Sequence, residues 1–356
     1  MLDKSCRTYN GYDANFDFNV VIKHILKYGT PPENYFYSGN QKDGRGNIAP
    51  ATIILPTIAM ETRGDIGNKS IKDFMSKLNR YIEECRDELL ERFTHIASQS
   101  PASATFMYFN NTMLGYVPEE GIISALKHGT LAIGQIGIAE TLQILIGKDQ
   151  TTPEGLALAK QIEETFNTRV AEFKAQTYEI LGQKIHLNYG VYYTPAESLC
   201  HTALNKFKEK YGIIPKVSDK KFFTNSIHVP VWIDVTPFEK IDIESQLTGY
   251  SNAGCITYVE IDSTASHNIK ALEELVNYAM EHDVPYLGIN LPNDTCMSCG
   301  WTGEINDKCP ACGGDDIKRL RRVTGYITND YITTFNEGKV DEVQHRVRHI
   351  GKVTNV

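Results

Sequence analysis

Long apolar runs are absent from this sequence. No stretch of about 18 consecutive apolar residues occurs, which excludes an ordinary membrane-spanning helix. The first ten residues, MLDKSCRTYN, contain no apolar segment of the kind that a secretory signal peptide needs. We therefore expect a cytoplasmic protein with no membrane partner.

Positive charge is also scarce. Lysine and arginine number 36 against 44 aspartate and glutamate residues, so the formal net charge is -8. Nucleic-acid-binding proteins generally present clustered lysine and arginine to the phosphates, and the acidic balance argues against such a partner. Hydrophobic residues make up 41% of the 356 residues, which is enough to bury one large core or two smaller ones.

A disulfide framework is not indicated. Four of the eight cysteines lie close together near the C-terminus, and the other four are scattered along the chain. This distribution suits reduced cytosol and a single metal site. Cys85, Cys200 and Cys255 lie in apolar patterns and are expected to be buried thiols, and Cys6 taken alone has the same interpretation.

The apolar periodicity predicts alternating helices and strands. Helices are expected at Ile71–Ser98, at Pro153–Leu181 after a threonine cap, after the segment TPAES that starts at Thr194, and at His267–His282. Strands are expected in ATIILPTIAM, NSIHVPVWI, CITYVEI and VPYLGINL. Strands that alternate with helices of this length indicate α/β architecture with parallel strands.

The clustered cysteines form the pattern C-x2-C-x9-C-x2-C. They are Cys296, Cys299, Cys309 and Cys312, and a glycine directly follows the second cysteine of each pair. Four thiolates on two tight turns suit tetrahedral zinc, and a site with no open position is structural. An iron–sulfur or redox role is the alternative, because thiolates suit those functions too.

Several other patterns have a structural and a functional interpretation. The glycines of LKHGTLAIGQIG either allow tight packing between a strand and a helix or admit substrate phosphates to a helix N-terminus. The segment TPAES either caps a helix or binds phosphate. His228 is expected to be a satisfied core histidine, and the basic run KRLRR from Lys318 to Arg322 to be a solvated surface or a docking face.

The segment RRVTGYIT contains Gly325, which by itself predicts a turn between two short strands. An Asn and Gly turn follows in FNEGK. It precedes a predicted helix that places apolar residues on one face: Val340, Val343, Val347 and Ile350.

Together, the cysteine pairs, RRVTGY and FNEGK resemble the C-terminus of the anaerobic ribonucleoside-triphosphate reductases, the class III glycyl-radical enzymes. The resemblance continues upstream, in order, through nearly the whole chain. Its segments are CRT, GRGNIAPATIILPTIAM, LKHGTLAIGQIGIAE, YYTPAESLCHTAL, FFTNSIHVPVWI and YLGINLPNDTC.

The resemblance implies two radical-carrying residues. Gly325 would hold a stored glycyl radical, generated by a partner activase that uses S-adenosylmethionine and an iron–sulfur cluster. Glycine suits this role because a Cα radical is stabilised when an amide nitrogen and a carbonyl flank it in one plane, and no Cβ hinders that planarity. Cys6 would form the thiyl radical that passes between the glycine and the substrate ribose, so we expect the two residues to meet at loop tips.

The resemblance also implies a fold. Residues 1–291 would form the C-terminal half of a ten-stranded α/β barrel with the thiyl-cysteine loop, residues 292–318 a zinc ribbon, and residues 319–356 the glycyl-radical loop and terminal helix. Reductases of this family are longer, and Met1 stands five residues before Cys6. We therefore expect the C-terminal part of a split or truncated enzyme that needs an N-terminal half and assembles as an oligomer.

The implied function is anaerobic reduction of ribonucleoside triphosphates to deoxyribonucleoside triphosphates. Ile54 replaces a polar residue that some members carry, which leaves formate and a thiol donor open as the reductant. The alternative is a non-catalytic zinc-ribbon fragment that binds a partner or a nucleotide. A glycyl-radical enzyme acting on a small acid or alcohol is less favoured, because such enzymes generally lack the four-cysteine ribbon before the glycine loop.

Overall fold

The structure is a computed structural model that describes residues 13–15, 18–29, 46–110, 112–113, 115–263 and 268–349. Cys6 and Ile350, both named above, lie outside the described residues. Across the described ranges, no helix is both long enough and apolar enough to traverse a lipid bilayer.

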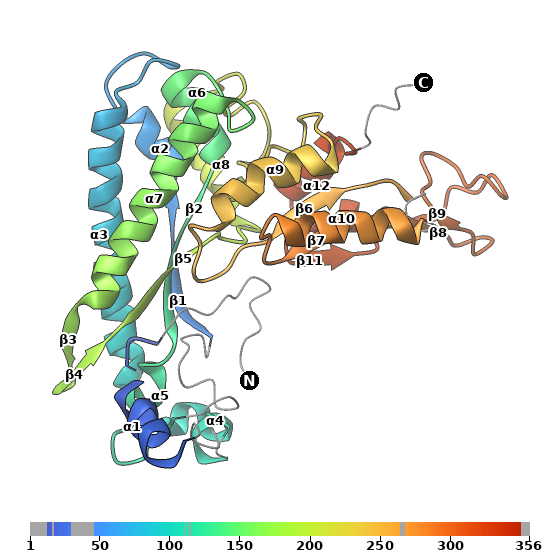
Figure 1. Ribbon diagram of the computed structural model, residues 1–356. Helices are drawn as coiled ribbons and strands as arrows, with labels where there is room; N and C mark the ends of the chain where they lie inside the picture. The colour runs from blue at the N-terminus through green and yellow to red at the C-terminus, as the bar shows by residue number, and fades with distance from the viewer. Residues whose placement is uncertain are drawn as a thin grey trace.

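A three-stranded parallel sheet forms the centre of the N-terminal part. Its strands are β1 (Asn47–Ile54), β2 (Thr130–Ile136) and β5 (Asn188–Tyr192), in the order β1-β2-β5. Two long helices, α3 (Ile71–Ala97) and α7 (Pro153–Ala175), cover one face of this sheet (Figure 1). Every residue of β2 and β5 is buried, so both faces of these strands are covered, as expected for parallel strands.

The helix predicted from Ile71 is confirmed. Ser70 caps α3 by accepting a hydrogen bond from the backbone N–H of Asp73. The helix buries one apolar stripe against the sheet, and the residues of this stripe are Phe74, Leu78, Ile82, Leu89, Phe93 and Ala97. Burial of each large side chain contributes about 1.5–3 kcal/mol, so packing rather than intrinsic propensity holds this helix.

The helix predicted from Pro153 is confirmed at its start and wrong at its end. Thr152 caps α7 as expected, but the helix ends at Ala175 and not at Leu181. Strand β3 (Thr177–Ile180) follows and forms an antiparallel hairpin with β4 (Gln183–His186). The side chains of β3 alternate between exposed and buried, which is the period of a strand.

Shorter helices connect these elements. The segment ATIILPTIAM divides between β1 and helix α2, which begins at Leu55 with Pro56 in its first turn. The remaining helices of the N-terminal part are α1 (Phe18–Tyr28), the 3-10 helix η1 (Pro101–Ala104), α4 (Thr105–Phe109), α5 (Ile123–Leu126), α6 (Ile138–Ile146) and α8 (Leu199–Tyr211).

A second parallel pair continues the sheet. Strands β6 (Thr257–Glu260) and β7 (Leu287–Asn290) pair in parallel, and a parallel bridge between Tyr192 and Gly254 joins the end of β5 to the chain before β6. Helices α9 (Pro237–Thr248) and α10 (Ile269–Glu281) pack beside this pair. The strands predicted in CITYVEI and VPYLGINL and the helix near residues 267–282 are thus confirmed.

The strand predicted in NSIHVPVWI is wrong. Residues 225–230 of this segment are buried but irregular, and side chains rather than a neighbouring strand satisfy part of the backbone. Gln150 Nε2 donates to the carbonyls of Ile227 and His228 at 3.1 and 2.6 Å. A short buried apolar run has the same composition whether its backbone is paired in a sheet or not, which explains the error.

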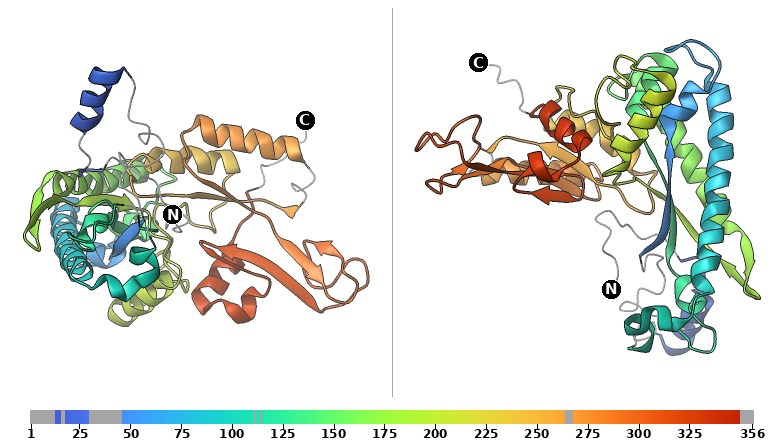
Figure 2. Two further views of the ribbon diagram at one scale, coloured as in Figure 1. Left: turned by 90° about the horizontal axis from the view of Figure 1, so that it is seen from below. Right: turned by 180° about the vertical axis from the view of Figure 1, so that it is seen from behind.

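The C-terminal part is an antiparallel sheet followed by two helices. Its strands are β8 (Asn293–Cys296), β9 (Thr302–Gly303), β10 (Ile317–Val323) and β11 (Tyr326–Thr328), in the order β11-β10-β8-β9. Helices α11 (Tyr331–Thr334) and α12 (Glu337–His345) follow. Figure 2 shows this part projecting from the N-terminal sheet.

Helix α12 is shorter than the sequence pattern predicts. Asn336 caps it by accepting a hydrogen bond from the backbone N–H of Lys339, but it ends at His345, so Val347 lies beyond it. The fold is therefore mixed α/β, and the strands do not close into a barrel within the described residues. The division at residue 318 stays a prediction, and β10 runs across that position.

Candidate functional site

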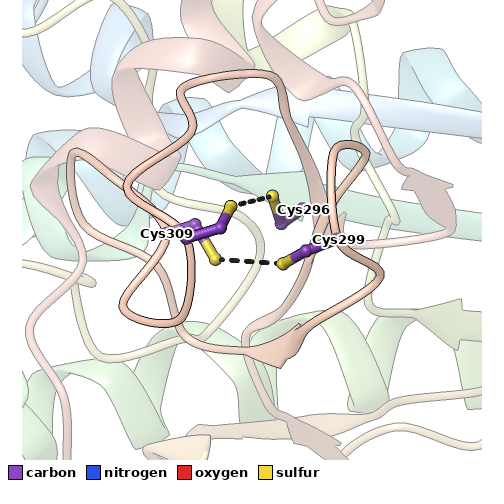
Figure 3. A group of neighbouring side chains, drawn as sticks. Cys296, Cys299 and Cys309 are labelled. Atoms are coloured by element: carbon purple, nitrogen blue, oxygen red, sulfur yellow. Dashed lines mark hydrogen bonds between the residues drawn. The ribbon is translucent and has the colours of Figure 1, made fainter.

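The four clustered cysteines converge on one point (Figure 3). Their Sγ atoms all lie within 4.8 Å of one another. The Sγ atoms of Cys296 and Cys312 are 3.6 Å apart, and those of Cys299 and Cys309 are also 3.6 Å apart. Tetrahedral zinc with Zn–S bonds of about 2.3 Å separates its sulfur ligands by roughly 3.8 Å, so this donor set fits zinc.

The local backbone explains why the thiols converge. Gly300 and Gly313, which follow the two pairs, adopt φ of +75° and +73°, a conformation that favours glycine. Each turn is closed by a backbone hydrogen bond, from Gly300 N to Cys296 O and from Gly313 N to Cys309 O, at 2.8 and 2.9 Å. The glycine positions in the pattern therefore serve the two tight turns predicted for a metal site.

Strand β10, which leaves the cysteine cluster, leads directly to the turn that contains Gly325, the candidate radical residue. Strand β10 pairs with β8 on one side and with β11 on the other, and Val323 pairs with Tyr326 across a two-residue turn of Thr324 and Gly325. The turn predicted at Gly325 is thus confirmed. Gly325 is exposed, and its neighbour Thr324 is buried. One sheet connects the cysteine cluster to this hairpin.

The positive φ of this turn falls on Thr324, at +53°, while Gly325 is not among the glycines with positive φ. Two-residue hairpin turns need positive φ at their first central residue, where glycine is usual. Glycine at position 325 is consequently not explained by the left-handed conformation that accounts for most turn glycines.

The interpretation of KRLRR as a solvated surface is wrong for its arginines, which are half-buried, whereas Lys318 is exposed. Arg319 and Arg321 both form ion pairs with Asp294, whose side chain is fully buried. Arg322 Nε donates to the carbonyl oxygen of Thr324 at 3.0 Å. These side chains attach β10 to β8 and shape the turn.

Helix α8 begins beside the hairpin, and its N-terminus is not capped by a side chain. Ser198 occupies the cap position without accepting a backbone hydrogen bond, and no acidic residue lies in the first turn, so capping does not explain Ser198. The pKa of the Tyr326 phenol is raised by its hydrogen bond to Glu197. The β11 side of the hairpin therefore contacts the TPAES segment.

The first residues of TPAES contact strand β1 and the segment at Asn225. Thr194 Oγ1 lies 3.0 Å from Thr52 Oγ1, and the backbone N–H of Ala196 donates to Asn225 Oδ1 at 2.8 Å. A Cβ at Gly134 would lie 2.2 Å from Thr194 Oγ1. The packing interpretation of LKHGTLAIGQIG, a tight turn between a strand and a helix, is confirmed at Gly137. This residue follows β2 with φ +78°, and a Cβ there would lie 2.5 Å from Pro56 Cγ in α2.

A buried ionic group lies below the hairpin, and the sequence pattern did not indicate it. His228 Nδ1 is 3.1 Å from Glu244 Oε2, and Lys240 Nζ is 3.5 Å from Glu244 Oε1. Burial raises the pKa of Glu244, but Lys240 and His228 outweigh it and lower that pKa to about 2. His228 is therefore a buried histidine that pairs with Glu244 through Nδ1, in agreement with the predicted core position.

The isolated cysteines and Ile54 occupy the N-terminal part. Cys200 and Cys255 are buried as predicted, whereas Cys85 is half-buried. Burial raises the pKa of the Cys85 thiol to about 12, so it is protonated at neutral pH. Cys85 and Ile54 both line a cavity of about 590 Å³ between β1 and α3.

The comparisons with known proteins agree with one another. A family model described as anaerobic ribonucleoside-triphosphate reductase matches residues 3–349. The protein of that name from Escherichia coli (strain K12) is 32% identical over 371 residues, covering 97% of this chain and 49% of its own length. The one from Enterobacteria phage T4 is 33% identical over 325 residues, covering 88% of this chain and 50% of its own length.

Solved structures give the same fold. An anaerobic ribonucleotide reductase has a TM-score of 0.63 at 18% identity, covering 84% of this chain and 44% of its own. The enzyme from Thermotoga maritima with glycerol in its active site has a TM-score of 0.57 at 17% identity, covering 78% and 41%. The chain thus spans about half the length of the curated relatives that it matches.

Proposed function

Because the chain belongs to the anaerobic ribonucleoside-triphosphate reductase family, we propose that it is the C-terminal catalytic part of an enzyme that reduces ribonucleoside triphosphates. The product is the corresponding deoxyribonucleoside triphosphate. The observation that carries this proposal is the exposed glycine at position 325, which sits in a turn whose left-handed residue is its neighbour. Its lack of a side chain suits radical storage.

Gly325 stores the radical in this proposal. A partner activase, which uses S-adenosylmethionine and an iron–sulfur cluster, removes one hydrogen atom from its Cα. The exposure of Gly325 at a hairpin tip supports access by a separate protein. The adjacent amide nitrogen and the glycine carbonyl share the unpaired electron when all three groups are coplanar, and a glycine reaches that planarity without a Cβ in the way.

Cys6 performs the substrate chemistry. Its thiol gives a hydrogen atom to the radical, and the thiyl radical then takes the 3′ hydrogen of the ribose. The 2′ hydroxyl leaves as water, and two electrons from formate or from a thiol donor complete the reduction. Cys6 lies outside the described residues, so its meeting with Gly325 remains an expectation from the family resemblance.

The N-terminus of α8 receives the substrate phosphates. It has no side-chain cap and no acid in its first turn, and it lies beside the hairpin. Free backbone N–H groups at a helix N-terminus attract anions, because the helix dipole adds positive potential there. This arrangement supports a triphosphate substrate oriented toward the radical residues.

The four cysteines hold a structural zinc ion. Its donor geometry leaves no open ligand position, so the ion stabilises the ribbon and takes no part in the reduction. Strand β10 then connects this fixed point to the hairpin. Residues 292–318 act as the ribbon and residues 319–356 as the radical loop and terminal helix.

An N-terminal half completes the enzyme. The parallel strands β1, β2, β5, β6 and β7 form half of a ten-stranded barrel in this proposal. Within the described residues β1 pairs only with β2, and Pro50 in its middle suits an edge strand. Unpaired strand edges tend to recruit other strands, which supports association with an N-terminal half and an oligomeric enzyme.

Electron paramagnetic resonance tests this function. The chain is incubated anaerobically with its activase and a candidate N-terminal half, and wild type is compared with Gly325→Ala. We expect a doublet in wild type, from the one hydrogen left on the glycine Cα, and none in the variant. Absence of the doublet in both, with a demonstrably active activase, would instead support the non-catalytic zinc-ribbon fragment.

A further inference from the structure

The carbonyl oxygen of Thr324 accepts two hydrogen bonds from side chains of residues outside the two-residue turn. The phenol of Tyr258, in β6, donates to it at 3.1 Å. The Nε of Arg322, in β10, donates to it at 3.0 Å. Tyr258 and Thr324 are 66 positions apart in the sequence, and both are buried. Strand β6 is therefore attached directly to the hairpin tip.

Both donors are themselves held in place. The Arg322 guanidinium lies 5.1 Å from the centroid of the Tyr258 ring, so each donor packs against the other. Arg346, which follows α12, donates from Nη1 to the carbonyl of Arg322 at 2.7 Å. Arg346 also pairs with Glu260, two residues after Tyr258 on the same strand, at 3.4 Å. The terminal helix thus supports this arrangement.

The conformation of Thr324 requires such support. A threonine at φ +53° is uncommon, because its branched Cβ crowds the backbone there. Conformations of this kind are energetically unfavourable and persist where the surrounding contacts hold them in place. Two hydrogen bonds to the Thr324 carbonyl, one buried and one half-buried, stabilise this conformation.

We propose that Tyr258 and Arg322 clamp the peptide plane between Thr324 and Gly325, and that Tyr258 is a positioning residue for the glycyl radical. The inference rests on the proposed function of Gly325. The Thr324 carbonyl belongs to the same amide as the Gly325 nitrogen, so its orientation decides whether that nitrogen is coplanar with the Cα radical. Hydrogen bonds to the oxygen also draw electron density from the nitrogen and thereby tune how the unpaired electron is shared.

The first test needs no radical. Hydrogen exchange is measured on the full chain for peptides that cover Arg321–Thr328, in wild type and in Tyr258→Phe. Loss of one buried hydrogen bond should speed exchange of the hairpin amides by about two- to tenfold. Tyr178→Phe is the matched control, because its phenol also donates to a buried carbonyl, that of Phe173 at 3.0 Å, far from the hairpin in sequence.

The second test uses the activated protein. In Tyr258→Phe we expect the doublet to change its splitting and the radical yield per chain to fall several-fold, while Tyr178→Phe matches wild type. Arg322→Gln removes the other donor and is expected to act in the same direction, which provides an independent variant if Tyr258→Phe folds poorly. A purely structural tyrosine would alter yield without altering the splitting.

The outcomes separate the two proposals. If wild type forms the doublet and both variants keep its splitting and the wild-type exchange rates, the clamp is refuted and the function of Gly325 stands. If wild type forms no doublet with an active activase, while Tyr258→Phe accelerates hairpin exchange, the function fails and the clamp on the hairpin is supported.

Discussion

Asp294 of β8 accepts hydrogen bonds from both terminal nitrogens of Arg321 in β10. Arg321 Nη1 lies 2.5 Å from Oδ1, and Nη2 lies 3.2 Å from Oδ2. The carboxylate is fully buried and also accepts a bond from the backbone N–H of Ile305, in the loop between the cysteine pairs. One side chain therefore attaches the cysteine loop and the hairpin strand to each other.

Replacing the Asp294 carboxylate should loosen the attachment between the cysteine loop and strand β10. Asp294→Ala removes the ion-pair partner of the half-buried Arg321 guanidinium and leaves the backbone N–H of Ile305 unpaired, and the loss should approach the roughly 3–5 kcal/mol of a broken buried pair. We expect chemical unfolding of the C-terminal part at lower denaturant concentration and faster hydrogen exchange in β10. Asp315→Ala, at an exposed position just after the second cysteine pair, is the control. Equal unfolding midpoints in the two variants would contradict this role of Asp294.

The cysteine cluster should bind zinc through all four thiolates. Cys296→Ser removes one ligand from a buried position, so zinc content should fall from about one ion per chain to a small fraction of that. The ribbon should loosen while the N-terminal sheet keeps its stability. Metal analysis after dialysis makes the measurement, and Cys85→Ser is the control because that thiol lies outside the cluster. Unchanged zinc in Cys296→Ser would eliminate the metal site.

Oxygen should cut the activated chain at Gly325. Oxygen adds to an exposed Cα radical, and the resulting peroxyl species breaks the backbone there. Exposure of the activated sample to air is expected to release the fragment Tyr326–Val356, detected by mass spectrometry. Gly325→Ala should stay intact. Gly249→Ala should still be cut, because a Cβ at Gly249 meets nothing within 4 Å and leaves the fold unchanged. Cleavage at another position would show that the radical is stored on a residue other than Gly325.

Glu163 should make stability fall as pH rises. Gln135 Nε2 donates to its Oε1 at 2.6 Å in the core, and burial raises the pKa of the carboxyl from 4.5 to about 8. Its contribution to stability is therefore fully present below pH 4.5, declines as pH rises, and is lost above about pH 8. At about 1.4 kcal/mol per pKa unit, the loss is on the order of a few kcal/mol.

Glu163→Gln removes this titration. Denaturant unfolding at pH 5 and at pH 8 should show a smaller loss of stability in Glu163→Gln than in wild type. Glu140 leaves some dependence, because burial raises its pKa to about 7. Glu164→Gln alters the exposed neighbouring carboxyl and should behave as wild type. An identical pH dependence in wild type and Glu163→Gln would show that Glu163 is not the titrating group.

The sequence predicted the features that depend on local spacing. The cysteine pattern, the helix from Ile71 and the turn at Gly325 each follow from residues a few positions apart, and the structure has all three. The end of α7 was predicted six residues too late, at Leu181 instead of Ala175, because the apolar residues of β3 continue the helical pattern by coincidence. Periodicity alone does not separate these alternatives.

The long-range polar contacts could not be predicted. Asp294 accepts hydrogen bonds from two arginines, and Tyr258 donates a hydrogen bond to Thr324. Both contacts join residues that are distant in sequence, so no residue spacing predicts them. The run KRLRR was interpreted as surface because lysine and arginine are usually exposed. Arg319 and Arg321 are instead held by a buried carboxylate, and a single sequence gives no indication of where that partner lies.

Strand β10 also sets a length. Ile317 pairs with Cys296 at one end, and Val323 pairs with Tyr326 at the other. Its seven residues span roughly 20 Å at about 3.3 Å per residue, so the strand sets the distance between the cysteine cluster and the hairpin tip. A deletion of one residue would shorten this reach by about 3 Å and turn alternate side chains to the opposite face. The loops of the ribbon can therefore vary in length without displacing Gly325, whereas β10 cannot.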